Sequence, residues 1–312
     1  MYAVIALYKI VSIENTTEEI KRWRSFLEGV GAMARIYLSE DGVNCQMSLP
    51  KELLPSFLDW LGEDERFADT DVKVQWHHEH VFPRLTVKYR EQLCALDCPV
   101  PFEKQATHLS AEEWDAMLAE GDEETVVLDV RNEYEWEVGH FEGALRPPVD
   151  SFRDFPAYLE ELKERLNPET SRILMYCTGG IRCEFFSPLM KKAGFTNLYQ
   201  LKGGVIRYGL ERGQGKWRGN LFVFDDRLVI PVGEERGEAI SHCQFCLKPS
   251  DQFYNCANME CNELFLSCPA CAAERKGCCS EVCLETGKCR PFAPNADPKP
   301  FRRLPHDQKA AL

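Results

Sequence analysis

The hexapeptide Cys177-Thr178-Gly179-Gly180-Ile181-Arg182 combines residue types that can hold and activate a thiolate. It follows the apolar segment 173–176, which predicts a strand, and Ile181-Arg182 begins a predicted helix. Two consecutive glycines let the backbone curl so that successive N–H groups point at one centre, and a helix N-terminus adds partial positive charge. Such surroundings lower the pKa of a thiol and stabilise a thiolate or a persulfide anion. We therefore predict that Cys177 is a nucleophile, held by a loop of Thr178, Gly179, Gly180, Ile181 and Arg182.

The segments around this loop predict a parallel sheet that places Cys177 at its carboxyl edge. Predicted strands over residues 125–130, 172–177 and 197–201 alternate with helical segments, and a last helix follows Gly203-Gly204. This alternation predicts a parallel sheet covered by helices on both faces. Open sheets of this kind have their active sites at the carboxyl ends of the strands. We assign this α/β domain to residues 104–220.

A separate α+β domain is predicted for residues 1–96. Its predicted strands are residues 2–11, 34–38, 43–49, 72–76 and 84–89, and its predicted helices begin at Thr16 and cover residues 52–61. The order of these elements is typical of the ferredoxin-like fold. The turn-rich stretch 97–101 would link this domain to the next.

Length and composition favour a cytoplasmic protein of several domains. A chain of 312 residues suits two or three domains. None of its apolar stretches approaches the roughly 20 residues that cross a bilayer, so we predict no membrane association. The apolar start, residues 1–11, contains Lys9 but no basic leader, which favours a buried strand over a signal peptide.

Charge is distributed unevenly along the chain. The formal net charge is −13, yet residues 182–218 hold eight basic and two acidic side chains. Nucleic acids bind basic surfaces, so this segment is compatible with RNA binding, and equally with a small anion or an ordinary solvated face. The candidate RNA contacts are Lys191, Lys192, Lys202 and Arg207.

A third region, residues 235–290, is rich in cysteine. Of the 15 cysteines in the chain, ten lie between Cys243 and Cys289, and a reducing cytoplasm disfavours disulfides. Cysteines spaced by two to four residues can bind one tetrahedral ion, which predicts a zinc ribbon or a cross-braced zinc module. An iron–sulfur cluster and metal-free thiols are the alternatives. The candidate ligands are Cys243, Cys246, Cys256, Cys261, Cys268, Cys271, Cys278, Cys279 and Cys283. The proline-rich end, residues 291–312, predicts a flexible tail.

Several motifs around Cys177 resemble those of rhodanese domains. They are Leu128-Asp129-Val130-Arg131-Asn132, followed by Glu135 and residues 139–144, then residues 176–184 and 201–205. The resemblance covers roughly residues 105–218 and implies that Cys177 is the nucleophile, which carries a persulfide in sulfur-transferring relatives. It also implies that Asp129 and Arg131 support the loop. The six residues from Cys177 to Arg182 match sulfurtransferases, whereas the related dual-specificity phosphatases have one more, so phosphatase activity is disfavoured.

The chain as a whole resembles the bacterial tRNA uridine hydroxylase family over about residues 1–290. Besides the loop, the matching segments are residues 82–88, 216–219 and 222–227. Membership implies a tRNA substrate, oxygen-dependent formation of 5-hydroxyuridine at the wobble position, and dependence on Cys177. Molecular oxygen and an unidentified reductant would be co-substrates. A sulfurtransferase and a non-catalytic adaptor are the competing functions, and the intact loop argues against the adaptor. The oligomeric state is not determined by the sequence.

Overall fold

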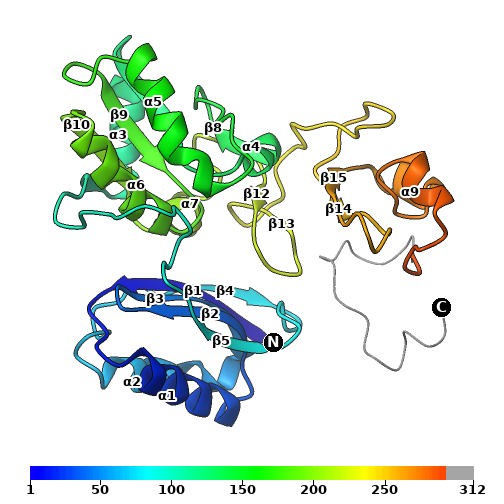
Figure 1. Cartoon of the computed structure of the whole chain (residues 1–312), viewed down its shortest axis with the longest axis horizontal. Coiled ribbons are helices and arrows are strands. Elements are labelled where there is room, and N and C mark those ends of the chain that lie inside the picture. Colours follow the sequence, from blue (N-terminus) through cyan, green and yellow to red (C-terminus); the bar gives the residue numbers. More distant parts are fainter. Residues whose placement is uncertain (293–312) are drawn as a thin grey trace.

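The computed structural model describes residues 1–292, which form an N-terminal domain, a central domain and a small Cys-rich module (Figure 1). The predicted mixed α/β class, with a ferredoxin-like and a parallel-sheet part, is confirmed. The predicted flexible tail at residues 291–312 lies, from residue 293 onward, outside the described residues. Within residues 1–292, no helix has both the length and the apolar character that crossing a membrane requires.

The N-terminal domain is a five-stranded sheet with two helices on one face. Its elements are β1 (Tyr2–Ile10), α1 (Thr16–Gly29), β2 (Met33–Ser39), β3 (Gly42–Pro50), η1 (Lys51–Leu53), α2 (Leu54–Gly62), β4 (Lys73–His77) and β5 (Leu85–Tyr89). The order β4-β1-β3-β2 is antiparallel and ferredoxin-like, and β5 adds a strand parallel to β2. Buried residues such as Trp23, Leu27 and Phe57 pack the helices onto the sheet. The opposite face of the sheet is turned toward the central domain (Figure 1).

The central domain has the predicted parallel sheet, with strand order β6-β10-β9-β7. Its elements are β6 (Thr107–Leu109), α3 (Ala111–Glu120), β7 (Thr125–Asp129), α4 (Glu133–Val138), β8 (Gly139–Phe141), η2 (Phe152–Asp154), α5 (Phe155–Arg165), β9 (Arg172–Tyr176), α6 (Ile181–Lys192), β10 (Asn197–Leu201) and α7 (Gly204–Arg212). The edge strand β6 and helix α3 precede the first strand that the sequence pattern indicated. A capping box between Ser110 and Glu113 starts α3, because each residue bonds the backbone N–H of the other.

Alternating side chains of the inner strand β9 build a core on each face of this sheet. Ile173 and Met175 belong to the cluster that contains residues of α5 and α6. Leu174 and Tyr176 belong to the cluster that contains Trp114 of α3 and residues of α7. Because both faces are covered, the carboxyl end of β9 is held rigidly where Cys177 begins the loop.

The C-terminal part consists of short paired strands and two short helices. These are β11 (Trp217–Gly219), β12 (Leu221–Phe222), β13 (Val229–Ile230), β14 (Phe253–Asn255), β15 (Leu264–Leu266), α8 (Pro269–Glu274) and α9 (Glu281–Glu285). Strand β11 pairs with β8, so this part is anchored to the central domain. Phe222, Phe253 and Tyr134 of α4 make edge-to-face ring contacts that extend the anchor toward the Cys-rich module.

Polar contacts join the N-terminal sheet to the carboxyl edge of the central sheet. The Tyr8 hydroxyl donates to Glu184 Oε1 at 3.0 Å, and Arg207 of α7 forms an ion pair with Asp71. Arg35 Nη1 donates to the Phe224 carbonyl at 3.0 Å. The loop that contains Cys177 therefore lies between the two domains.

Candidate active site at the Cys177 loop

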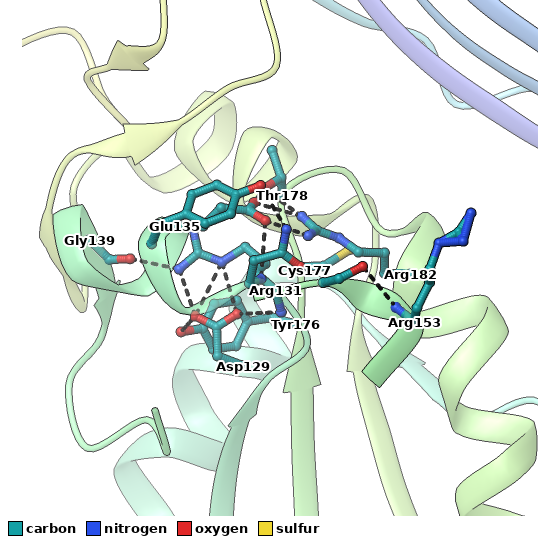
Figure 2. Close-up of polar contacts among 12 residues, drawn as sticks. Asp129, Arg131, Glu135, Gly139, Arg153, Tyr176, Cys177, Thr178 and Arg182 are labelled. Atoms are coloured by element: carbon teal, nitrogen blue, oxygen red, sulfur yellow. Dashed lines mark hydrogen bonds and ion pairs between the residues drawn. The ribbon is translucent and has the colours of Figure 1, made fainter. Parts of the chain in front are cut away.

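The N-terminal ends of α6 and α7 both direct backbone N–H groups at the Cys177 loop. Cys177 follows β9 and is 0% exposed, and its Sγ accepts a hydrogen bond from the Gly180 N–H at 3.1 Å. At the start of α7, Val205 N–H donates to the Cys177 carbonyl and Ile206 N–H to the Thr178 carbonyl, each at 3.0 Å. These two hydrogen bonds fix the loop backbone against the start of α7. The Gly180 N–H therefore points at the sulfur, as the glycine pattern predicts. Figure 2 shows Cys177 among the ion pairs that surround the loop.

Two glycines are required by the close approach of neighbouring groups. Gly180 has φ +102°, and a Cβ there would lie 2.9 Å from the Tyr8 hydroxyl oxygen. Gly204 has φ +66°, and a Cβ there would lie 2.5 Å from the Cys177 carbonyl oxygen. Larger residues would push Tyr8 off the loop or α7 away from it.

A bidentate ion pair between Arg182 and Glu135 closes the loop. Arg182 Nη1 lies 2.5 Å from Glu135 Oε2, and Nη2 lies 2.8 Å from Oε1. The Thr178 hydroxyl donates to Glu135 Oε1 at 3.1 Å, and Glu135 is 0% exposed. Glu135 belongs to the rhodanese-like motif, but no role was predicted for it. Glu135 lies three residues after Asn132 and accepts a hydrogen bond from the Asn132 N–H at 3.1 Å. In the sequence this spacing indicates only the start of a helix.

Asp129 and Arg131 form a second buried ion pair beneath the loop (Figure 2). Arg131 Nη2 lies 2.6 Å from Asp129 Oδ2 and donates to the Gly139 carbonyl at 2.6 Å, and both side chains are 0% exposed. The Tyr176 hydroxyl donates to Asp129 Oδ2 at 2.6 Å. The pair therefore contacts the residue that precedes Cys177, and no hydrogen bond joins it to the sulfur among the described residues.

The pKa of Cys177 is lowered to about 6. Burial alone would raise the pKa of this thiol, but hydrogen bonding with Cys183, the charge of Arg182 and the Gly180 N–H outweigh that effect. Burial raises the pKa of Cys45, Cys94, Cys98 and Cys183 instead. Cys177 is thus the thiolate of this part of the chain at neutral pH, and Cys183 remains a thiol.

Cys177 lines a cavity of about 390 Å³ between the two domains. The cavity lies near the lower end of the roughly 300–1,000 Å³ typical of ligand pockets. The central domain contributes Thr178, Gly179 and Arg182, and the N-terminal sheet contributes residues such as Tyr8, Asn44 and Lys73. The strand patterns assigned no site role to these three residues of the N-terminal sheet, because they do not show which face of the sheet will cover another domain.

The four candidate RNA contacts are not equivalent. Lys192 and Lys202 are exposed, and Lys202 directly follows β10 at the carboxyl edge of the sheet. Lys191 donates to the Gln105 carbonyl, and Arg207 pairs with Asp71. Lys191 and Lys192 lie at the end of α6 remote from Cys177.

The Cys-rich module contains two groups of four thiols. One group is Cys243, Cys246, Cys268 and Cys271, the other is Cys256, Cys261, Cys279 and Cys283, and the Sγ atoms of each lie within 4.8 Å of one another. The groups alternate along the chain, which is the cross-braced arrangement. Cys278 belongs to neither group, and its Sγ lies 3.4 Å from that of Cys289.

Carbamidomethylation of Cys177 is expected to rise with pH to a plateau with a midpoint near its lowered pKa of about 6. The reagent reacts with the thiolate, so the rate follows ionisation. Peptide mass spectrometry after timed exposure to iodoacetamide measures this rate for each cysteine. Cys45, whose pKa is raised by burial, serves as the internal control and should stay unmodified. A midpoint at the ordinary thiol value would contradict the account of the loop.

Substitution of Arg131 by Met should destabilise the protein by about 3–5 kcal/mol, because it leaves the buried Asp129 carboxylate without its cation. The free energy of unfolding from urea titration measures this loss. Arg146→Met, which removes exposed ion pairs with Glu133 at 2.8 Å and Glu137 at 3.1 Å, is the matched control and should cost less than about 1 kcal/mol. Equal losses of unfolding free energy in the two variants would show that the buried ion pair stabilises the protein no more than an exposed one.

Comparison with known proteins agrees with this architecture. Residues 2–93 match the UPF0176 acylphosphatase like domain, residues 110–209 the Rhodanese-like domain and residues 218–284 the Rhodanase C-terminal family. A protein of Chlamydia pneumoniae named tRNA uridine(34) hydroxylase is 46% identical over 304 residues, which cover 97% of this chain and 93% of that protein. A protein of the same name from Protochlamydia amoebophila is 46% identical over 305 residues, 98% of this chain and 95% of the relative. With such identity over nearly the full length of both proteins, this chain belongs to the tRNA uridine(34) hydroxylase family.

Proposed function

We propose that this chain hydroxylates the wobble uridine of tRNA and that Cys177 is essential for the reaction. The observation that supports this most is the enclosure of the thiolate in a 390 Å³ cavity built by two domains. An enzyme reaches the reactive atoms of a base by turning that base out of its stack into a pocket, which costs least in single-stranded regions. An anticodon loop offers such a base. The relatives at 46% identity are named for the same reaction.

The proposed reaction uses molecular oxygen and a reductant as co-substrates. When one atom of O₂ is inserted at carbon 5 of uracil, two electrons and two protons are needed to convert the other atom to water. A reductant must therefore be supplied from outside the tRNA. The residues of the pocket bind and orient the base, and the buried loop keeps bulk water from Cys177. A tRNA substrate places the reaction in the cytoplasm.

For the tRNA backbone we propose Lys192 and Lys202 as phosphate contacts, since both are exposed. Lys191 and Arg207 are engaged within the protein and would contribute mainly long-range charge. Phosphate contacts of this kind position a nucleic acid without reading its sequence.

In the Cys-rich module we propose two structural zinc ions, one in each group of four thiols. A tetrahedral site with Zn–S bonds of about 2.3 Å separates neighbouring sulfurs by about 3.8 Å. Cys246 and Cys268 Sγ lie 3.7 Å apart in one group, and Cys261 and Cys279 Sγ lie 3.7 Å apart in the other. Four protein ligands leave no open position, which favours a structural over a catalytic role.

Sulfur transfer through a persulfide on Cys177 is the second candidate function. The N–H groups of the loop and the lowered pKa of Cys177 support it equally, because a persulfide is also an anion. The enclosing N-terminal sheet favours hydroxylation, since transfer to a small thiol or cyanide requires no second domain over the loop.

Deletion of the gene should abolish 5-hydroxyuridine and its derivatives in tRNA, as measured by mass spectrometry of nucleosides. Wild-type protein should restore the modification, whereas Cys177→Ala should leave it at least about 100-fold lower. Cys98→Ala, a cysteine outside the pocket with a raised pKa, is the matched control and should restore it fully. Unchanged nucleosides in the deletion strain would refute hydroxylation and leave sulfur transfer as the leading function.

Purified protein should contain two zinc ions per chain, one for each group of four cysteines. The double variant Cys243→Ser/Cys246→Ser should retain one zinc by plasma mass spectrometry and lose thermal stability, because the metal binding energy is folding energy. Cys278→Ser/Cys289→Ser should retain two, since neither thiol belongs to the groups. Stoichiometric iron with visible absorption would instead identify an iron–sulfur cluster.

A further inference from the structure

Lys73, the first residue of β4, is a buried cation that the reaction scheme above does not use. Its side chain is 0% exposed, although it lies at the interface between two domains. Lysine is almost never fully buried unless its charge is balanced. The groups around its ammonium therefore decide whether Lys73 is structural or functional.

The charge of Lys73 is only partly balanced within the chain. Its Nζ lies 3.1 Å from Asp71 Oδ2, but no hydrogen bond of good geometry reaches the ammonium from any described residue. The same carboxylate also pairs with Arg207 through Oδ1. Among these three residues one carboxylate thus serves two cations, which leaves an excess of positive charge that acts on the Cys177 thiolate. Burial lowers the pKa of Lys73, and Asp71 opposes that effect.

The side chain of Lys73 belongs to the face of the sheet that covers Cys177. Lys73 pairs in register with Ala6 of β1, and Ala6, Tyr8 and Gln75 line the same cavity as Cys177. Its Nζ lies 5.3 Å from the centroid of the Tyr8 ring, whose hydroxyl reaches α6 through Glu184. Lys73 therefore faces the cavity from the wall opposite the catalytic loop.

Other cations of the cavity differ from Lys73. Arg182 is paired bidentately with Glu135, and Arg227 lies 2.6 Å from Asp225. Arg35, at the exposed edge, donates to the Phe224 carbonyl. Lys73 is the fully buried cation of the cavity that still has donor capacity, because an ammonium offers three N–H groups and no acceptor.

We propose that Lys73 binds a carbonyl oxygen of the substrate base in the Cys177 pocket, as a catalytic residue contributed by the N-terminal domain. This rests on the proposed function, under which the base is uracil. Uracil presents two carbonyl oxygens, O2 and O4, and one N–H, and an ammonium can meet only the oxygens. A buried cation next to a carbonyl stabilises negative charge that develops on the oxygen when the ring reacts.

The charge of Lys73 in the pocket can be tested without any enzymatic assay. Iodoacetate, an anion, and iodoacetamide, its neutral analogue, alkylate the same Cys177 thiolate, so the ratio of their rates does not depend on the pKa of the thiol. Lys73→Met should lower the iodoacetate-to-iodoacetamide ratio about fivefold, and Lys73→Arg should preserve it. Lys9→Met, which removes an N-terminal-domain cation that pairs with the exposed Asp69, should leave the ratio unchanged.

An unchanged ratio in Lys73→Met would overturn the proposal. If this variant loses the native circular dichroism spectrum, Lys73→Gln takes its place, because the amide can still bond Asp71 while the charge is removed. This ratio stays informative even if the protein hydroxylates no tRNA. Failure of the proposed function and failure of this inference are therefore separate results.

Contact with the base itself is tested with tRNA that contains 2-thiouridine or 4-thiouridine at position 34. Lys73→Met should lower the hydroxylation rate at saturating tRNA about 100-fold, with little change in tRNA affinity, which phosphate contacts dominate. Sulfur accepts hydrogen bonds weakly, so thio-substitution at the contacted oxygen should slow the wild type and have no further effect in Lys73→Met. If the rate of Lys73→Met no longer falls with the 4-thiouridine substrate, the contacted oxygen is O4. If it no longer falls with the 2-thiouridine substrate, the contacted oxygen is O2. If the rate of Lys73→Met still falls with both substrates, as in the wild type, Lys73 does not contact the base and the proposal is wrong.

Discussion

The buried ion pair between Arg182 and Glu135 is the interaction on which the catalytic loop depends. It joins the start of α6 to the start of α4 across 47 residues of sequence, with both bonds between 2.5 and 2.8 Å. Loss of either partner would leave a buried charge, at a cost of about 3–5 kcal/mol. Because Glu135 satisfies Arg182 within the fold, the guanidinium stays beside Cys177 and helps to lower the pKa of that thiol. One contact thus contributes both to the conformation of the loop and to the reactivity of its thiol.

The second constraint is that the loop is completed by another domain. Tyr8 approaches Gly180 so closely that only glycine fits there, and its hydroxyl bonds Glu184. Asp71 of the N-terminal domain pairs with Arg207 of α7. An isolated central domain would keep the thiolate but lose one wall of the 390 Å³ cavity. The Cys177 loop thus forms one wall of a pocket that the N-terminal sheet completes.

Cysteine has two different uses in this chain, and the surroundings decide between them. Cys177 accepts a hydrogen bond from a loop N–H next to a fixed guanidinium, and these surroundings lower its pKa and suit a nucleophile. The cysteines of the C-terminal module face one another in two groups of four, which suits a tetrahedral metal ion. The two sites are separate, since α6, β10, α7 and β11 to β13 lie between the Cys177 loop and the module in sequence, and Figure 1 shows the module apart from β9 and α6.

Local sequence patterns were enough to predict the secondary structure elements, and they single out Cys177 as the candidate nucleophile. Apolar periodicity predicted the ferredoxin-like strands, the parallel sheet and its helices, and the Cys177-to-Arg182 motif predicted the thiolate loop, because these depend on neighbours along the chain. The packing of the whole chain decides which distant residues meet: Glu135 with Arg182, Lys73 with the Cys177 cavity, and each thiol with its group of four. It also placed β5 parallel to β2 and left Cys278 outside the two groups of four thiols. Such pairings are not encoded in local spacing, since they arise when separate elements are packed together to bury their apolar faces.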